Sequence, residues 1–179
     1  LCTALAGRQK LRITYRTVDH DNPVERTICP VKLILFKQEL YFICISERHE
    51  NRDYYIKLCR IVSAELLDET FTVGEKRIRR IQNRLSKSFG ILDEDVPKPQ
   101  KIMIKFPYYF QLILNERRFH ASQKTRVDKD GDVILTMDAP VDRELIQWVL
   151  GWSESATVIK PKALKDKLRA LGRHMVSIY

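Results

Sequence analysis

Glycine is scarce in this chain, with 6 residues among 179, and none of them belongs to a glycine-rich phosphate loop. The sequence also lacks the GxSxG turn of serine hydrolases, the HExxH helix of zinc proteases and a carboxylate pair on one helix face. These absences remove the common signatures of hydrolytic, nucleotide-dependent and metal-dependent enzymes. We therefore expect a protein that is not an enzyme and that holds no metal or cofactor.

Long apolar runs are absent as well. The longest strand-like run extends from Leu40 to Ile45, far short of the about 20 residues that a membrane helix needs. This pattern predicts a soluble protein without a membrane partner, located in the cytoplasm.

Cysteines occur singly rather than in pairs. The chain has 4 of them, Cys2, Cys29, Cys44 and Cys59, with no CxxC motif and no histidine at zinc-binding spacing. Isolated cysteines of this kind usually behave as small apolar residues. We therefore predict four reduced core residues.

Positive charge is abundant, with a formal net charge of +9. Such a balance favours an acidic partner, such as nucleic acid or a nucleotide, although charge alone does not identify it. The length and the hydrophobic content of 44% suit one ordinary domain or two small ones. The first residues, Leu1 to Ala6, resemble the tail of a helix, so the chain is expected to be part of a longer protein.

The first part of the chain reads as short strands separated by polar turns. The expected strands are 10–16, 25–36, 39–46, 53–58 and 60–67. Five short strands with short connections predict a small SH3- or Sm-like barrel that closes on itself. This domain is expected to occupy residues 1–72.

A basic helix is expected next, over residues 75–90. Its apolar stripe contains Ile78, Ile81, Leu85, Phe89 and Leu92, and six cations share the rest of its circumference with the single acid Glu75. Acidic residues and two prolines from Asp93 to Pro99 then predict an exposed linker and a domain boundary. Helix and linker together form the expected segment 73–99.

Residues 100–179 predict a ferredoxin-like βαββαβ domain with one helix appended, which gives the whole chain an α+β class. The expected elements are strand 101–106, helix 107–115, strands 117–126 and 132–138, a helix from Asp142 to Leu150, strand 155–160 and a final helix from Pro161. Asp142 is a good N-cap and Gly151 a good helix stop.

Cations within the apolar strands of the first domain are the most informative feature. An unpaired cation is costly away from water, so a Lys or Arg there is expected at a rim, beside a carboxylate or facing an anionic ligand. We predict a phosphate-binding mouth on the barrel formed by Tyr15, Arg16, Arg26, Tyr41, Lys57 and Arg60. The basic helix supplies further candidates for contact with a nucleic-acid backbone, namely Arg77, Arg80 and Arg84.

Each candidate has a structural alternative. Arg60 can pair with Glu65 or Glu25, Arg26 can pair with Asp19 or Asp21, and Lys57 can be a solvated strand residue. Tyr15 and Tyr41 can stack on bases or fill the core, and we favour stacking for Tyr15 and packing for Tyr41. The basic helix can simply be a solvated face.

Other residues are expected to have no ligand role. His49 and His120 lack partners at metal or catalytic spacing, so we interpret both as surface or packing residues. Trp148 and Trp152 are interpreted as core or dimer-contact residues.

Several short motifs resemble the WYL domain of bacterial transcription regulators. Leu40-Tyr41-Phe42 stands against the family's Trp-Tyr-Leu, and Ile56-Lys57-Leu58-Cys59-Arg60-Ile61 against its Phe-Arg-Leu-Asp-Arg-Ile. The opening tyrosine matches Tyr15, and the Arg-x-x-x-Pro of the second strand matches Arg26 and Pro30. Lys57 replaces the family's arginine and offers a point charge instead of a bidentate grip, so ligand affinity or specificity is expected to differ.

The second half resembles the WCX extension that often follows a WYL domain. The matching segments are His120-Ala121-Ser122-Gln123, Asp130-Gly131, Trp148-Val149-Leu150-Gly151 and Val158-Ile159-Lys160-Pro161. The resemblance covers nearly the whole chain. It implies the sensing and dimerising part of a bacterial transcription regulator, which works as a homodimer and takes single-stranded DNA or a nucleotide as effector.

In such regulators an N-terminal winged helix-turn-helix, absent from this sequence, reads the operator DNA. The alternative from a different class is a non-catalytic assembly module whose basic residues are structural.

Overall fold

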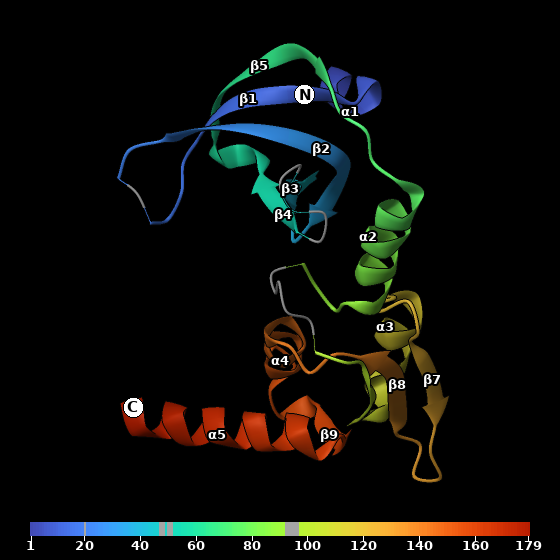
Figure 1. Cartoon of the computed structure of the whole chain (residues 1–179). Helices are drawn as coiled ribbons and strands as arrows, with labels where there is room; N and C mark the ends of the chain where they lie inside the picture. The colour runs from blue at the N-terminus through green and yellow to red at the C-terminus, as the bar shows by residue number, and fades with distance from the viewer. Residues whose placement is uncertain (20, 47–48, 50–51, 92–96) are drawn as a thin grey trace. The chain divides into compact units, whose positions relative to one another are not determined.

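The computed structural model describes residues 1–19, 21–46, 49, 52–91 and 97–179 (Figure 1). The described chain divides into two compact units, Leu1–Ile81 and Gln82–Tyr179, and each unit contains one antiparallel sheet. The predicted α+β class is confirmed.

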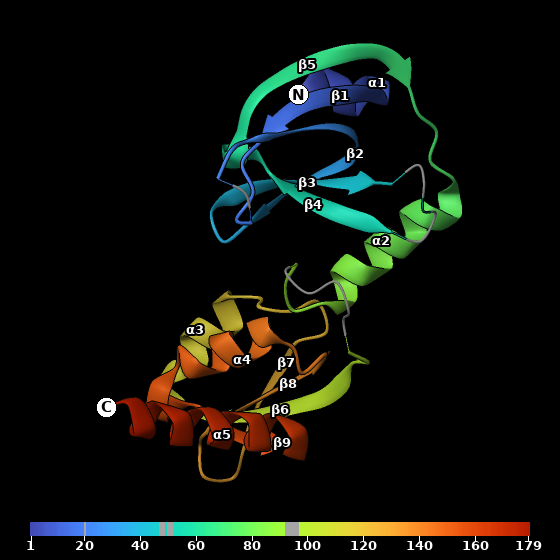
Figure 2. The ribbon, with the colours of Figure 1, turned by 60° about the vertical axis from the view of Figure 1, so that its left-hand side comes forward.

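The N-terminal unit is a strongly curved five-stranded sheet (Figure 2). Its elements are α1 (Cys2–Gly7), β1 (Gln9–Tyr15), β2 (Val24–Phe36), β3 (Glu39–Ile45), β4 (Asp53–Lys57), the 3₁₀ turn η1 (Leu58–Arg60) and β5 (Ile61–Thr70). Along β1 the buried residues Leu11, Ile13 and Tyr15 alternate with more exposed ones, as a strand with one apolar face requires. These side chains pack with Ile28 and Phe42 into the core of the unit.

The predicted closure of this sheet is not seen. The strand order is β4-β3-β2-β1-β5, so β4 and β5 form the two edges of an open sheet. They follow one another in the chain but pair with different partners, β3 and β1, because η1 turns the backbone between them. The apolar pattern predicts that Arg60 begins a strand. In the structure Arg60 instead lies in this 3₁₀ turn.

The basic helix is α2 (Glu75–Lys87). It is shorter than the predicted helix 75–90, and Phe89 and Gly90 follow it outside the helix. The division between the two compact units falls within α2, after Ile81. Residues 93–96 of the predicted linker, and Leu92 of the predicted apolar stripe, lie outside the described residues.

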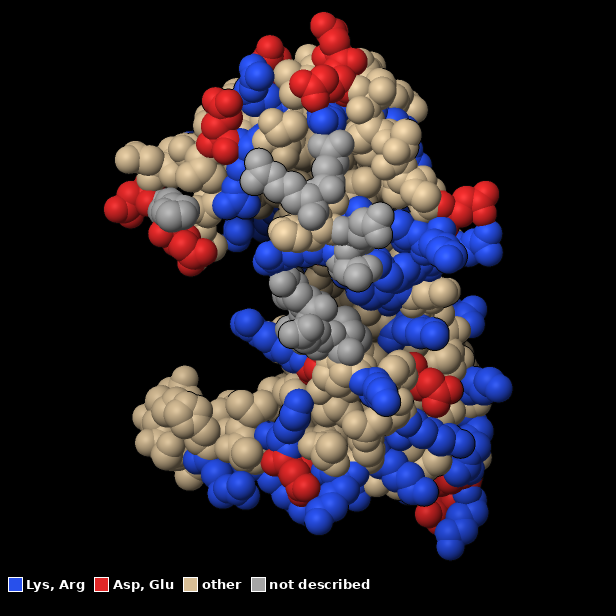
Figure 3. All heavy atoms as spheres, viewed as in Figure 1, with Lys and Arg blue, Asp and Glu red and all other residues tan. Residues whose placement is uncertain are grey.

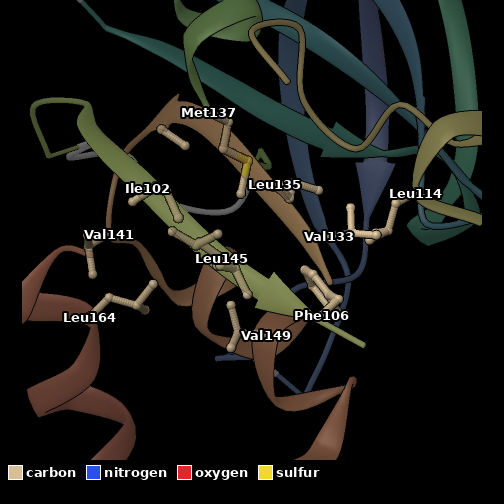
Figure 4. Packing of buried hydrophobic residues seen from close by; sticks show 12 residues of the cluster. Ile102, Phe106, Leu114, Val133, Leu135, Met137, Val141, Leu145, Val149 and Leu164 are labelled. Atoms are coloured by element: carbon tan, nitrogen blue, oxygen red, sulfur yellow. The ribbon is translucent and has the colours of Figure 1, made fainter. Parts of the chain in front are cut away.

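The C-terminal unit is a four-stranded sheet with the order β7-β8-β6-β9. Its elements are β6 (Gln100–Phe106), the 3₁₀ turn η2 (Tyr108–Phe110), α3 (Gln111–Glu116), β7 (Lys124–Val127), β8 (Val133–Ala139), α4 (Arg143–Leu150), the 3₁₀ turn η3 (Ser153–Ser155), β9 (Thr157–Lys160) and α5 (Lys162–Ile178). Figure 4 shows its core, where side chains from β6, β8, α4 and α5 meet, including Ile102, Leu135, Leu145 and Leu164. Asp142 caps α4 by accepting the Leu145 N–H at 2.8 Å, as predicted.

The predicted strand 117–126 is wrong except at its end. Only Lys124–Val127 is a strand, because local side-chain bonds hold the preceding residues in turns. Gln123 accepts the Phe119 N–H and donates to the carbonyl of Leu114, and His120 is bonded to Ser122.

The interpretation of His120 as a packing residue is confirmed, since it is 6% exposed and its ring stacks on Phe89. Trp148 and Trp152 pack against the C-terminal core, which agrees with the expected core role.

All four cysteines are free, as expected, but only two are core residues. Cys29 and Cys44 are buried, whereas Cys2 and Cys59 are exposed at α1 and η1. Across the described part of the chain, none of the helices combines the length and apolar character needed to cross a membrane.

Candidate ligand site on the N-terminal unit

A hydrogen bond to a tyrosine side chain connects the end of β1 with the end of β4. The side chain of Tyr15 points into the core, where the residue is 6% exposed, and its hydroxyl accepts the backbone N–H of Lys57 at 3.1 Å. This burial leaves little of the Tyr15 ring for stacking on a base. Tyr15 therefore holds Lys57 in place.

A second link joins the next residue to η1. The backbone N–H of Arg16 donates to the carbonyl of Arg60 at 2.9 Å. Arg16 is exposed and Arg60 is partly buried. Four of the six predicted site residues, Tyr15, Arg16, Lys57 and Arg60, are thus gathered where β1, β4 and η1 meet.

Tyr41 and Glu39 lie on the neighbouring strand. Tyr41 is directly opposite Lys57 in the β3–β4 pair and is partly buried. Glu39 is two residues earlier on β3, and its carboxylate lies 3.0 Å from the Lys57 ammonium. The hydrogen bond to Lys57 lowers the pKa of Glu39, and the same bond raises the pKa of Lys57.

Arg26 lies on β2, further along the sheet from Tyr15, Arg16, Lys57 and Arg60. It pairs with Ile13, two residues from the pair formed by Val24 and Tyr15, and it is exposed. Directly opposite residues of antiparallel strands share a face, so Arg26 belongs to the face of Ile13 and Tyr15.

The carboxylates predicted as alternative partners of Arg60 are used elsewhere. Glu25 and Glu65 both pair with Arg12, at 3.5 and 2.9 Å. Among the described residues, no ion pair within 4.0 Å involves Arg16, Arg26 or Arg60. Lys57, in contrast, is paired with Glu39 and not simply solvated.

The cations of α2 have internal contacts. Arg77 donates to the carboxylate of Asp53 at 2.9 Å and to the carbonyls of Ser46, His49 and Arg52. Arg80 reaches the same Asp53 at 3.3 Å, and the Asp53 side chain is only 2% exposed. Arg84 is partly buried and belongs to the C-terminal unit. Figure 3 shows Lys and Arg side chains gathered over α2.

Sequence reasoning did not identify the roles of Glu39, Arg12 and Asp53. Their pairing depends on strand register and on the docking of α2, which the sequence does not show. The alternation of Arg12 with Leu11 and Ile13 was a usable signal, because it places Arg12 on the face opposite the core.

Two family matches cover most of the chain. Residues 1–66 match the WYL domain family, and residues 107–176 match the WCX domain family. The chain contains a WYL domain followed by a WCX domain. The candidate site at Tyr15, Arg16, Lys57 and Arg60 lies within the WYL domain, and the sheet β7-β8-β6-β9 lies largely within the WCX domain.

Solved structures with similarity to this WYL–WCX chain include two larger proteins. Proteasome accessory factor B/C (PafBC) of Arthrobacter aurescens is 15% identical, with a TM-score of 0.37, and the match covers 94% of this chain and 25% of that one. A CRISPR Cas-related protein is 11% identical, with a TM-score of 0.50, and the match covers 99% of this chain and 49% of that one. The second likeness shows a shared fold. No curated protein matches the chain.

Proposed function

We propose that this WYL–WCX chain is the effector-sensing and dimerising part of a bacterial transcription regulator and has no catalytic activity. The two family matches support a regulatory module. In this proposal the chain works as a homodimer in the cytoplasm, and operator DNA is read by a winged helix-turn-helix domain elsewhere in the protein. We further propose that the WYL sheet is an open form of the Sm-like barrel and that the WCX unit is ferredoxin-like, which its strand order supports.

The effector in this proposal is single-stranded nucleic acid or a nucleotide. One observation carries it: the Arg16–Arg60 backbone bond and the Tyr15–Lys57 bond bring the backbones of three cationic residues together at one end of the WYL sheet. Two of these cations, Arg16 and Arg60, have no ion-pair partner among the described residues. Guanidinium groups of this kind bind phosphate oxygens with two parallel hydrogen bonds.

The residues divide into roles. Arg16, Arg26 and Arg60 bind phosphate, the partly buried Tyr41 contacts a base, and Tyr15 positions Lys57. Arg80 and Arg84 add sequence-independent attraction to a nucleic-acid backbone. The exposed fraction of the Arg77 side chain is only 13%, so we assign it the smallest contribution of the three candidate arginines of α2.

Fluorescence anisotropy with a labelled single-stranded oligonucleotide tests this function. We expect binding at low salt, and we expect Arg16→Ala combined with Arg60→Ala to weaken it by about tenfold or more, since each charge-assisted hydrogen bond contributes roughly 1.5–3 kcal/mol. Arg12→Ala is the matched control, because Arg12 lies on the same strand as Tyr15 but its guanidinium is paired with Glu25 and Glu65. Absence of binding by the native chain, or equal losses in the control and the double variant, would contradict the proposal.

A second candidate function is an assembly module in which the basic residues are structural. The Arg77–Asp53 and Lys57–Glu39 pairs favour it, because they show that some of the cations stabilise the WYL unit itself. This alternative predicts that alanine variants of the site lower the melting temperature, with no oligonucleotide affinity to lose.

A further inference from the structure

Glu39 is an acid inside the cationic group. It is the first residue of β3 and lies two residues before Tyr41, so both side chains project from the same face of the strand. Tyr41 pairs with Lys57 across the sheet. The Glu39 carboxylate is therefore placed directly at the candidate site.

The groups around this carboxylate are those that would hold a phosphate oxygen. The Lys57 ammonium is 3.0 Å away, and Cys59 and Arg60 add smaller contributions that lower the pKa of the carboxylate. Anionic oxygens bound by ammonium and guanidinium groups form the strongest hydrogen bonds in proteins. Glu39 thus marks a point in the structure where an anion is stabilised.

Stability alone gives little reason for this arrangement. The side chains of Lys57 and Glu39 are 23% and 41% exposed. Ion pairs with this degree of exposure contribute little to stability, so the pair can open at low cost. Three other acids of this sheet have partners away from the site: Glu25 and Glu65 pair with Arg12, and Asp53 pairs with Arg77.

We propose that Glu39 is an internal competitor, a carboxylate that occupies the phosphate position of the WYL site until a phosphate-bearing ligand displaces it. This inference rests on the proposed function and names its regulation. A phosphate that binds Lys57 must then displace the Glu39 carboxylate, so a single small anion gains little binding free energy. A ligand with several phosphates makes additional contacts with Arg16 and Arg26. These contacts favour binding of an oligonucleotide over binding of free phosphate.

The test compares Glu39→Gln with Glu65→Gln, because both changes remove one negative charge, and of the two acids only Glu39 is paired with a site cation, Lys57. The probe is a fluorescein-labelled oligothymidylate of about eight nucleotides, within the range that small single-strand binding domains cover. We expect Glu39→Gln to tighten binding by about fivefold, the upper end for an exposed ion pair, and Glu65→Gln to change it less than twofold. Inorganic phosphate should displace the probe at lower concentrations from Glu39→Gln than from the native chain.

The outcomes separate the inference from the function. If the native chain binds and the two variants behave alike, the competitor role is overturned while the function stands. If only Glu39→Gln binds, the competitor role is supported, but the native chain does not bind the probe and the proposed effector is contradicted. If neither binds, both proposals fall. Should Glu39→Gln melt below the native chain, Glu39→Thr, which suits a strand position, repeats the comparison.

Discussion

At the scale of single residues, burial and hydrogen bonding separate positioning groups from groups that can contact a ligand. The hydroxyl of Tyr15 accepts the Lys57 N–H inside the core, whereas Arg16 and Arg26 are exposed.

Tyr15→Phe leaves that N–H without its acceptor, and we expect a loss of roughly 1–3 kcal/mol in the free energy of unfolding. Urea denaturation measures it, with Tyr108→Phe at an exposed site as control. Equal stability of the two variants would show that the bond has no such role.

The lowered pKa of Glu39 gives a direction for the pH dependence of binding. The paired Lys57 ammonium, with smaller contributions from Cys59 and Arg60, holds the pKa of Glu39 below the ordinary glutamate value of 4.5, and Tyr41 lies opposite Lys57. The ion pair is therefore complete at neutral pH and is lost as the pH falls through the lowered pKa.

We expect the affinity for oligothymidylate to rise in that acidic range beyond the general gain from other protonating acids. Anisotropy titrations across this pH range measure the rise. Glu39→Gln should lack the extra component, and the same pH profile in both proteins would contradict the competitor role.

The sequence could identify the cations of the site but not all of their partners. The cations within apolar strands indicated Lys57 and Arg60, and the resemblance matched these residues and Tyr15 to family positions. The pairing of Lys57 with Glu39 depends on the β3–β4 register, which joins residues 18 positions apart. Nothing in the local sequence distinguishes Glu39 from other strand-end acids.

At the scale of elements, α2 is fixed to the WYL sheet by one buried carboxylate. Arg77→Ala removes the closest partner of Asp53 and three bonds to backbone carbonyls. Breaking a buried pair usually costs about 3–5 kcal/mol, and the lower end applies because Arg80 still reaches Asp53. Chemical denaturation should therefore show a loss of about 3 kcal/mol.

Arg79→Ala is the control for this prediction. Arg79 pairs with Glu75 one turn away on the same helix, and both side chains are largely exposed. Such pairs contribute about 0.3–0.5 kcal/mol. A similar loss in Arg79→Ala and Arg77→Ala would show that α2 is not held by Asp53.

Elements with strong periodicity were predicted well, whereas those set by specific side-chain bonds were not. The stripe of α2 and the cap of α4 could be read from the sequence. The turn η1 could not, because the apolar run from Ile56 to Ile61 has the composition of a strand. The pattern over residues 117–123 predicts a strand. In the structure the Gln123 side chain forms hydrogen bonds with backbone groups there and holds the segment in turns.

At the scale of the whole molecule, the net charge of +9 predicts salt-dependent binding of a polyanion. Each phosphate contact to a single strand changes the slope of log K against log salt by about 0.7. Arg60→Ala should lower the magnitude of the slope by that amount, and Arg126→Ala on β7 of the WCX unit should leave it unchanged. Anisotropy titrations at several salt concentrations measure this, and an equal effect of both changes would indicate only diffuse attraction.

The most direct test of the central claim is the location of the bound nucleic acid. An oligothymidylate containing 4-thiothymidine can be cross-linked to the native chain by light, and mass spectrometry then identifies the attached residues. The account predicts cross-links at the end of β1, on β3 near Tyr41 and in η1. Cross-links confined to the WCX unit, or none at low salt, would contradict a phosphate-binding site on the WYL sheet.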